Sequence, residues 1–444
     1  MVSKKQRFKT VILVIILAAA IVAGVFGISY AKGGVTFPWQ VVATDTQEEE
    51  TTTEPEEEVP QVIIKEPETT EPQIEVEEDE PEIDEEESQD DAEVTDSDIV
   101  TSGQHLDYYG ALTVEDGNLV DSDGNTARLV GVSSHGLSWY PAFVTPEAIE
   151  SLRDNWGINV IRLAMYTSDY NGYCVGGSDI QDSLKETIYD AIDAATDKDM
   201  YVIVDWHTLN DADPNEYKSE AIQFFGELVR KYENNDNIIY EICNEPNGDT
   251  TWADIRNYAN EVIPVIRNVD DDAIILVGTP DYCSDLTSVL KRPLDFDNVM
   301  YTYHFYAGTH KSEARDELEA ALEEGLPVFI SEYGFVSADG DGSVATKEAE
   351  KWIQLMNEYQ LSSCIWNLSN KDEGSALITA DTENTYDFTY EELSDQGQYF
   401  IDVLSDYGKE TLTESDTEEI EEEAQETTDT TSKKANSSSK NKSR

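Results

Sequence analysis

Two glutamates in this chain lie in short apolar runs that also contain other polar residues. Glu245 closes the run 238–245 directly after Asn244, and Glu332 lies within the run 327–334. Two carboxyl groups can hydrolyse a glycosidic bond if one remains protonated to act as the acid and the other is ionised. No metal-ligand spacing accompanies them, so we expect acid/base chemistry without a metal ion.

The surroundings of the two glutamates predict different pKa values. Arg162 and Tyr306 are suited to keep Glu332 ionised, because a cation and a hydroxyl donor favour the charged form of a carboxyl group. Burial and the second carboxylate would raise the pKa of Glu245. We therefore assign Glu245 as the acid and Glu332 as the nucleophile.

Further polar and aromatic side chains lie near the ends of the same kind of apolar run. Three of the five histidines are among them. If the runs are parallel strands of a closed barrel, their carboxyl ends meet at one rim, where chemistry is placed. A purely structural scaffold has no need of this set: His135, Trp139, Arg162, Tyr166, His207, Asn244, His304, Tyr306 and Trp366.

The runs themselves predict the fold. Each is almost continuously apolar, as expected of strands buried on both faces, and helical patterns or long loops separate them. Eight such units predict an α/β fold of the (β/α)8 TIM-barrel type. The doubly wound alternative needs a glycine-rich turn after the first strand, which residues 131–135 do not supply. The expected strands are 129–133, 159–166, 201–207, 238–245, 273–279, 299–306, 327–334 and 362–369, and the expected helices are 146–155, 182–198, 220–234, 252–268, 312–324 and 346–359.

The segment before the barrel carries two turn signals, Glu-Asp-Gly-Asn at 115–118 and Asp-Ser-Asp-Gly-Asn at 121–125. Residues 112–130 are therefore predicted to form an N-terminal β-hairpin cap under the barrel floor. Cys243 and Cys364 lie in apolar runs and are predicted to be buried thiols, whereas the sequence leaves a bridge between Cys174 and Cys283 open.

Several motifs resemble those of glycoside hydrolase family 5, in particular its bacterial endoglucanase branch, over roughly residues 106–405. Glu-Ile-Cys-Asn-Glu-Pro resembles the acid/base signature of the family, and Val-Phe-Ile-Ser-Glu-Tyr-Gly resembles its nucleophile strand. The resemblance implies a cofactor-free (β/α)8 enzyme that hydrolyses β-1,4-glucan with retention. Its motifs occupy residues 131–139, 205–207, 241–246, 303–306, 328–334 and 366–373.

The resemblance also implies roles for individual residues. Glu245 would be the proton donor and Glu332 the nucleophile. Asn244 would bind the 2-hydroxyl of the sugar at the cleavage point. The other implied sugar contacts are His207, His304, Tyr306 and Trp366 around that sugar, and Trp139, Tyr166, Lys371 and Glu373 on the non-reducing side. One departure is Tyr282, which stands where the family usually has tryptophan, so that the leaving-group side has a smaller platform.

Charge narrows the range of partners. The chain has 94 acidic and 29 basic residues in 444, a formal net charge of −65. Such a field repels phosphate backbones, so we exclude nucleic acid as a partner and expect a neutral substrate, a β-glucan. Residues 337–343 contain Asp-Gly-Asp-Gly but lack the remainder of a calcium-loop pattern, so no metal and no cofactor is predicted.

The two ends differ from the middle. Residues 1–31 have a basic start followed by the uncharged apolar run 11–28. They are predicted to be a signal peptide cleaved after Ala31, or an uncleaved signal anchor that spans the membrane. Residues 32–100 are a predicted disordered acidic linker and 411–444 a predicted disordered tail, which leaves 101–410 as the catalytic barrel. The protein is thus expected to be monomeric and extracellular, either secreted or anchored at the cell surface.

Three alternatives remain open at this stage. The same machinery could act on another β-1,4 polymer, such as mannan, xyloglucan or lichenan. A carbohydrate-binding surface protein without catalysis would be expected to lack one of the two carboxylates, and both are present. An adhesin acting through its acidic arms would depend on residues 44–98.

Overall fold

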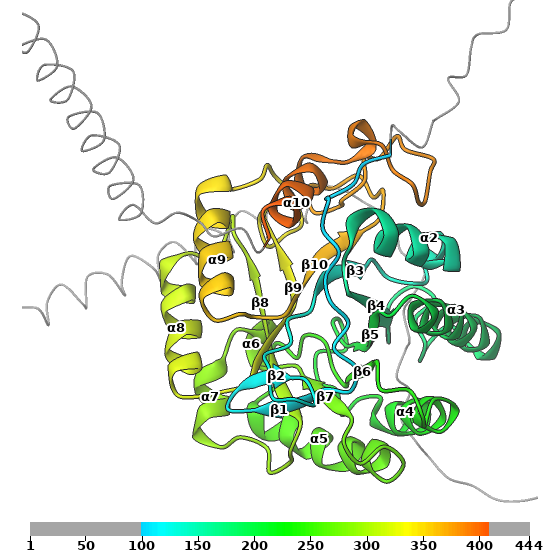
Figure 1. Ribbon diagram of the computed structural model, residues 1–444. Coiled ribbons are helices and arrows are strands. Elements are labelled where there is room, and N and C mark those ends of the chain that lie inside the picture. Colours follow the sequence, from blue (N-terminus) through cyan, green and yellow to red (C-terminus); the bar gives the residue numbers. More distant parts are fainter. Residues whose placement is uncertain (1–98, 408–444) are drawn as a thin grey trace, which may run out of the picture. The chain divides into compact units, whose positions relative to one another are not determined.

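The computed structural model describes residues 99–407, which contain a closed barrel of eight parallel strands surrounded by helices (Figure 1). The strand order around the barrel is β10, β3, β4, β5, β6, β7, β8, β9. The predicted (β/α)8 TIM barrel is therefore confirmed. The strands are β3 (Val130–Ser134), β4 (Val160–Tyr166), β5 (Tyr201–His207), β6 (Ile238–Glu241), β7 (Ile274–Val277), β8 (Val299–Tyr306), β9 (Val328–Gly334) and β10 (Ser363–Leu368).

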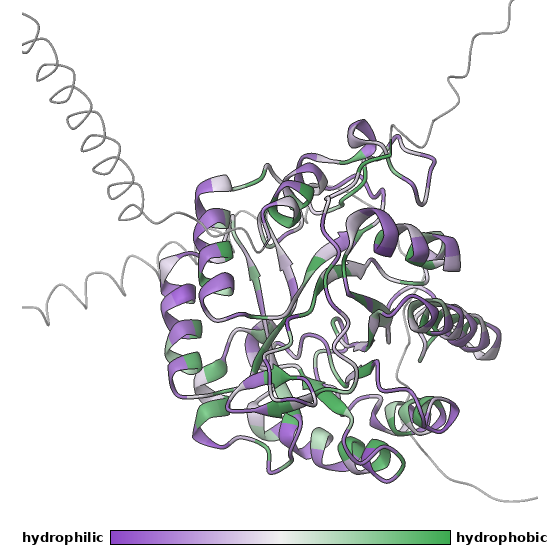
Figure 2. Ribbon diagram, viewed as in Figure 1, coloured by the Kyte–Doolittle hydropathy of each residue, from purple (hydrophilic) through white to green (hydrophobic). Residues whose placement is uncertain are grey.

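Every residue of these eight strands is buried, which explains their continuous apolar sequence. One face of each strand packs inside the barrel and the other against the outer helices. Figure 2 shows hydrophilic residues on the outward faces of those helices, for example α8 and α9. The helices are α2 (Pro146–Ser151), α3 (Ser178–Asp197), α4 (Lys218–Lys231), α5 (Trp252–Arg267), α6 (Pro280–Cys283), α7 (Leu286–Lys291), α8 (Ser312–Glu323), α9 (Thr346–Glu358) and α10 (Asp395–Ser405), with short helical turns at Pro141–Val144, Leu152–Trp156 and Tyr390–Glu392.

Helix α5 illustrates how the sequence specifies these helices. Thr251 precedes it, and its side chain accepts a hydrogen bond from the backbone N–H of Asp254 while the Asp254 carboxylate bonds back to the Thr251 N–H. This capping box satisfies two backbone donors that a helix start would otherwise leave unpaired. Three apolar residues of α5, Ile255, Val262 and Ile266, are fully buried in the main core.

The floor of the barrel is covered by the predicted hairpin. Strands β1 (Thr113–Glu115) and β2 (Asn118–Val120) pair antiparallel, and the two residues between them, Asp116 and Gly117, both have positive φ, as the tight Asp-Gly turn requires. A bridge between Val120 and Thr126 closes the second turn. Residues of this segment form one cluster with inward-facing side chains of the strands, and these segment residues are Leu112, Leu119, Ala127 and Leu129.

Helices α6, α7 and α10 were not predicted, and two of the predicted elements differ in form from the structure. Strand β6 ends at Glu241 rather than 245. The N–H groups of Ile242 and Asn244 still donate to β7 and β5, but the N–H of Glu245 donates at 3.0 Å to the carbonyl of Thr208, in the loop after β5. The predicted helix 146–155 is a short α-helix followed by a π-helical turn at Leu152–Trp156. Both changes occur at element ends, where local pattern is least informative.

The cysteines and the termini complete the comparison. All four cysteines are free thiols, and Cys243 and Cys364 are buried as predicted. Within residues 99–407 there is no helix long and apolar enough to cross a membrane. The predicted signal or anchor segment 1–31, almost all of the linker 32–100 and the tail 411–444 lie outside the described residues.

Candidate active site

A cleft of about 530 Å³ opens at the carboxyl ends of the strands. This is the end at which a (β/α)8 barrel places its reactive groups. Eleven of the fourteen residues predicted from the sequence line the cleft, and the other three are Arg162 and Asn244, fully buried, and the partly exposed Trp139. The eleven are His135, Tyr166, His207, Glu245, Tyr282, His304, Tyr306, Glu332, Trp366, Lys371 and Glu373.

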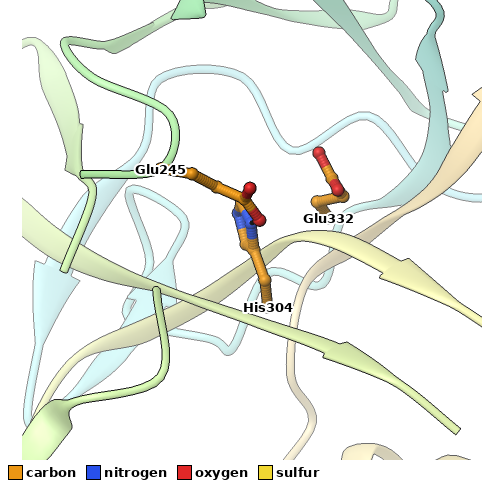
Figure 3. A group of neighbouring side chains, drawn as sticks. All are labelled: Glu245, His304 and Glu332. Atoms are coloured by element: carbon orange, nitrogen blue, oxygen red, sulfur yellow. Dashed lines mark hydrogen bonds and ion pairs between the residues drawn. The ribbon is translucent and has the colours of Figure 1, made fainter. Parts of the chain in front are cut away.

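The two glutamates meet across this cleft. Glu245 follows β6 and Glu332 lies on β9, and Figure 3 shows Glu245 beside His304 with Glu332 opposite. One carboxylate oxygen of each glutamate and a ring nitrogen of His304 all lie within 4.8 Å of one another. Retaining glycosidases place their carboxyl groups about 5–5.5 Å apart, whereas inverting enzymes need about 6.5–9.5 Å to admit a water molecule. An oxygen–oxygen separation of at most 4.8 Å fits a carboxylate that attacks the anomeric carbon directly.

Glu332 has donors on both oxygens. The Tyr306 hydroxyl donates to Oε1 at 2.7 Å, and the Arg162 guanidinium lies 3.4 Å from Oε2. The prediction that these two residues support its charged form is thus supported by geometry. Burial and the charge of Glu245 nevertheless raise the pKa of Glu332 to about 7, against the lowering effects of His304, Arg162 and Tyr306. Arg162 and Tyr306 thus favour the charged form of Glu332 as expected, while its burial raises the pKa above the ordinary value.

Glu245 is the more strongly protonated of the pair. Burial raises its pKa to about 8, and the charges of Asp205 and Glu241 add to this while Arg162 opposes it. The raised pKa was predicted, but the charges that raise it belong to two deeper acids, Asp205 and Glu241, and not to the second catalytic carboxylate. The acid therefore has the higher pKa and the nucleophile the lower, as double displacement requires.

A chain of hydrogen bonds explains how the proton on Glu245 is held. The Ser331 hydroxyl donates to Oε1 of Glu241 at 2.7 Å, so its oxygen is left to accept from Nε2 of His304 at 2.9 Å. Burial lowers the pKa of His304 to about 4, so the ring is neutral and its Nδ1 carries no proton. That nitrogen lies 2.8 Å from Oε1 of Glu245 and can only accept. Protonated Glu245 is the donor that completes this chain.

Arg162 organises the layer below the cleft. It lies on β4 with no exposure, and its guanidinium contacts Glu241 at 2.7 Å and Asp205 at 2.9 Å. These two buried acids raise the pKa of Arg162 although its burial opposes this. Since a buried charge is costly without a partner, the group is best understood as one ionic unit that fixes Arg162 beneath Glu332.

Asp205 and Glu241, together with Ser331, were missed as site residues by the sequence reasoning. Asp205 lies two residues before His207 on β5, and its Oδ2 is 2.6 Å from Nδ1 of that ring. Glu241 precedes Glu245 by four residues at the end of β6. The available signal was a charged residue inside an otherwise apolar strand, which is rare unless the charge is paired.

Asn244 lies next to Glu245 but outside the cleft lining, and its contact with the sugar 2-hydroxyl stays a prediction. Its side chain is fully buried, and its Oδ1 accepts from Arg162 at 2.7 Å. Its Nδ2 lies 3.3 Å from Nε2 of His207 and 3.2 Å from the carbonyl of Thr208. To donate a hydrogen bond to a sugar hydroxyl, Asn244 would have to use the Nδ2 proton that now points toward Nε2 of His207.

Aromatic rings and a charged pair form one end of the cleft. The indole of Trp366 lies nearly parallel to the ring of His207, with centroids 5.5 Å apart, and 5.3 Å from His135. Lys371 and Glu373 form an ion pair of 2.6 Å beside them. This end offers flat apolar faces together with hydrogen-bonding groups, a combination that suits a neutral sugar chain.

The opposite end is formed by the loop after β7. Asp281, Tyr282 and Cys283 all have left-handed backbone angles, with φ of 56°, 57° and 58°, which costs about 1–2 kcal/mol per residue outside glycine. The N–H of Tyr282 donates to the carbonyl of Pro246, next to Glu245, and its ring is half exposed. The turn thus presents the predicted tyrosine beside the acid. The polar cleft residues that the sequence reasoning missed are Asp281, Ser284, His310 and Asp339.

Comparison with known proteins agrees with the class that the fold and the paired glutamates define, a glycoside hydrolase. The family model "Cellulase (glycosyl hydrolase family 5)" matches residues 120–372. The chain therefore belongs to glycosyl hydrolase family 5.

Individual relatives are similar over most of the chain. Endoglucanase A of Butyrivibrio fibrisolvens is 61% identical over 411 residues, which are 91% of this chain and 95% of that protein. An endoglucanase of Clostridium saccharobutylicum is 43% identical over 65% of this chain and 64% of its own length. Among solved structures, the catalytic domain of a Thermobifida fusca endoglucanase in complex with cellotetraose has a TM-score of 0.63 at 34% identity and covers 67% of this chain and 97% of that domain.

The pH dependence should change in the Tyr306→Phe variant. Its lost hydroxyl stabilised the charged form of Glu332, so the pKa of Glu332 should rise and the acidic limb of the kcat/KM profile should move upward by about one pH unit. In the wild type, the active form with Glu332 ionised and Glu245 protonated is most populated between pH 7 and 8. A movement of the alkaline limb alone would contradict this assignment. The profile is measured with an aryl β-cellobioside.

Proposed function

We propose that this protein is an exported retaining endo-β-1,4-glucanase that cleaves internal bonds of cellulose-type glucans by double displacement. The observation that carries the proposal is the pair of glutamates within 4.8 Å, of which the one with the higher pKa adjoins His304 and the one with the lower pKa adjoins Tyr306 and Arg162. The 61% identity to an endoglucanase supports the same substrate class.

In the first step, the Glu332 carboxylate attacks the anomeric carbon and the bond to the leaving sugar breaks. Glu245 gives its proton to the departing oxygen, so no free alkoxide is formed. Glu332 loses its negative charge as the glucosyl ester forms. The Tyr306 hydroxyl and the Arg162 guanidinium are placed to stabilise the carboxylate before it attacks. Loss of the proton from Glu245 leaves a carboxylate facing the unprotonated Nδ1 of His304, which prepares it to take a proton back.

In the second step, a water molecule takes the place of the leaving sugar. Glu245 accepts one of its protons while the oxygen attacks the anomeric carbon, and the bond to Glu332 breaks. Two inversions at one carbon give net retention. Both carboxyl groups return to their starting states, so the cycle needs no cofactor.

The substrate assignment is tested by reducing-sugar release from carboxymethyl cellulose, lichenan, mannan and xyloglucan in parallel, with Glu332→Ala as the control. We expect the highest rate on carboxymethyl cellulose, a fast fall in viscosity that indicates internal cleavage, and no activity in the control. Preference for mannan or xyloglucan would reject the substrate assignment and keep the mechanism. A folded protein inactive on all four polymers would favour a carbohydrate-binding surface protein.

We also propose that the folded domain acts outside the cell as a monomer. The support for export is the sequence of residues 1–31 and the long acidic segment 32–100 that follows. Fractionation of expressing cells and N-terminal sequencing of the product distinguish the two forms. A new terminus after Ala31 means secretion, and an intact terminus in the membrane fraction means anchoring. Light scattering of the purified protein tests the monomer.

A further inference from the structure

An exposed tyrosine extends the aromatic end of the cleft beyond the residues assigned above. Tyr170 is 68% exposed, the highest value among the exposed large hydrophobic residues of 99–407. Its ring centroid lies 6.3 Å from that of Trp139, at an interplanar angle of 35°. Trp139 in turn lies 4.9 Å from the ring of Tyr166, which lines the cleft.

These rings continue a row that begins at the reacting centre. Trp366 and Tyr166 both pack in one cluster at the cleft with Tyr306, the partner of Glu332. From Tyr166 the row passes to Trp139, in the loop after β3, and then to Tyr170. In the strand order β3 lies across the barrel from β7, whose loop carries Tyr282 and bonds to Pro246 beside Glu245. Because Glu245 protonates the leaving group, the row lies on the side of the sugars that remain on the enzyme.

Tyr170 is held in place by its turn. The N–H of Gly172 donates to the carbonyl of Asp169 at 2.7 Å, which makes Tyr170 and Asn171 the two central residues of a β-turn. Ser138 donates to the carbonyl of Asn171 at 2.8 Å, so the turn is fastened to the loop that carries Trp139. On its other side the side chain of Asn210 donates to the Asp169 carboxylate at 2.6 Å.

We propose that Tyr170 forms an additional glucose-binding position, beyond Trp139, at the non-reducing end of the glucan cleft. The inference rests on the proposed function and concerns this chain's preference for longer substrates. A tyrosine ring offers a flat apolar face to the C–H face of a pyranose and a hydroxyl to its rim, and it loses little conformational freedom on binding. Because hydrogen bonds already hold the turn in place, little conformational entropy of the turn is lost when the sugar binds.

The test is the dependence of kcat/KM on chain length in the full-length Tyr170→Ala variant. Substrates are an aryl β-cellobioside and cellotetraose, cellopentaose and cellohexaose. We expect a loss of about three- to tenfold on the longest oligosaccharide, and a change within about twofold on the aryl cellobioside, which cannot reach Tyr170. The Tyr170→Trp variant should restore the preference for length.

Tyr108→Ala is the matched control, because Tyr108 is another exposed tyrosine, whose ring lies against Tyr201, a residue of the barrel-floor cluster. It should leave the length profile unchanged. An unchanged profile in Tyr170→Ala, or an equal loss on every substrate including the aryl cellobioside, would overturn the inference while leaving the proposed function intact. A wild type inactive on all cello-oligosaccharides would overturn both.

Discussion

The Glu332→Ala variant is expected to lose kcat on cellulose-type glucans by about 10⁴-fold or more, in line with the removal of a covalent nucleophile in other enzymes. No other carboxylate can replace it, because its position on β9 is fixed by the Tyr306 hydroxyl at 2.7 Å and by Arg162 below. The measurement is the initial rate on carboxymethyl cellulose and on dinitrophenyl β-cellobioside. Loss should be equally severe on both, since attack on the anomeric carbon is common to both.

Small anions provide the decisive control for this variant. Alanine at 332 leaves room for azide, which should attack the dinitrophenyl substrate once and yield an α-glycosyl azide with inverted configuration. A β-azide product, or substantial residual hydrolysis of the aryl substrate without azide, would show that Glu332 is not the nucleophile. Melting temperatures for wild type and variant separate this result from misfolding.

The architecture could be predicted because the barrel strands have a strong local signature. A strand that is buried on both faces must be apolar along its length, and β4, β5, β8 and β9 all show this. The end of β6 could not be predicted in the same way. Ile242 and Asn244 still bond to β7 and β5, and only the N–H of Glu245 reaches Thr208 in the loop after β5, a partner that no local pattern indicates.

The site was predictable to the extent that its residues stand at strand ends. Glu245, Glu332, His304 and Tyr306 follow this rule and line one cleft. The ionic layer beneath them does not follow it, because a buried charge can be interpreted only when its partner is known. Arg162 and Glu241 are 79 residues apart in the sequence, and no local pattern indicates that their side chains are in contact.

Relative pKa values also depend on contacts that the sequence does not contain. Both carboxyl groups are desolvated, so burial alone raises the pKa of each. Their order is decided by partners: His304, Arg162 and Tyr306 lower the pKa of Glu332, whereas Asp205 and Glu241 raise that of Glu245. Glu245 also adjoins an unprotonated imidazole nitrogen, Nδ1 of His304. Ser331 and Glu241 set that nitrogen, and they lie on two different strands.

The Glu245→Ala variant should separate the two steps of catalysis. On glucan the leaving oxygen needs the proton of Glu245, so kcat/KM should fall by about 10²–10⁴-fold, the range of general acid catalysis. On dinitrophenyl β-cellobioside the leaving group departs without a proton, so kcat/KM should stay close to that of the wild type. Without the base the second step is slow, and a burst of dinitrophenolate should precede a low steady rate.

Azide again distinguishes the roles, with the opposite stereochemistry. It needs no base, so it should accelerate the steady rate of Glu245→Ala and give a β-glycosyl azide by attack on the Glu332 ester. Glu245→Gln is the matched variant, because it keeps the volume and the neighbour His304 but cannot give or take the proton. Equal losses on the glucan and the activated substrate, with no burst and no azide effect, would mean that Glu245 is not the acid/base. The inverted product from Glu332→Ala and the retained product from Glu245→Ala together assign one carboxylate to each step.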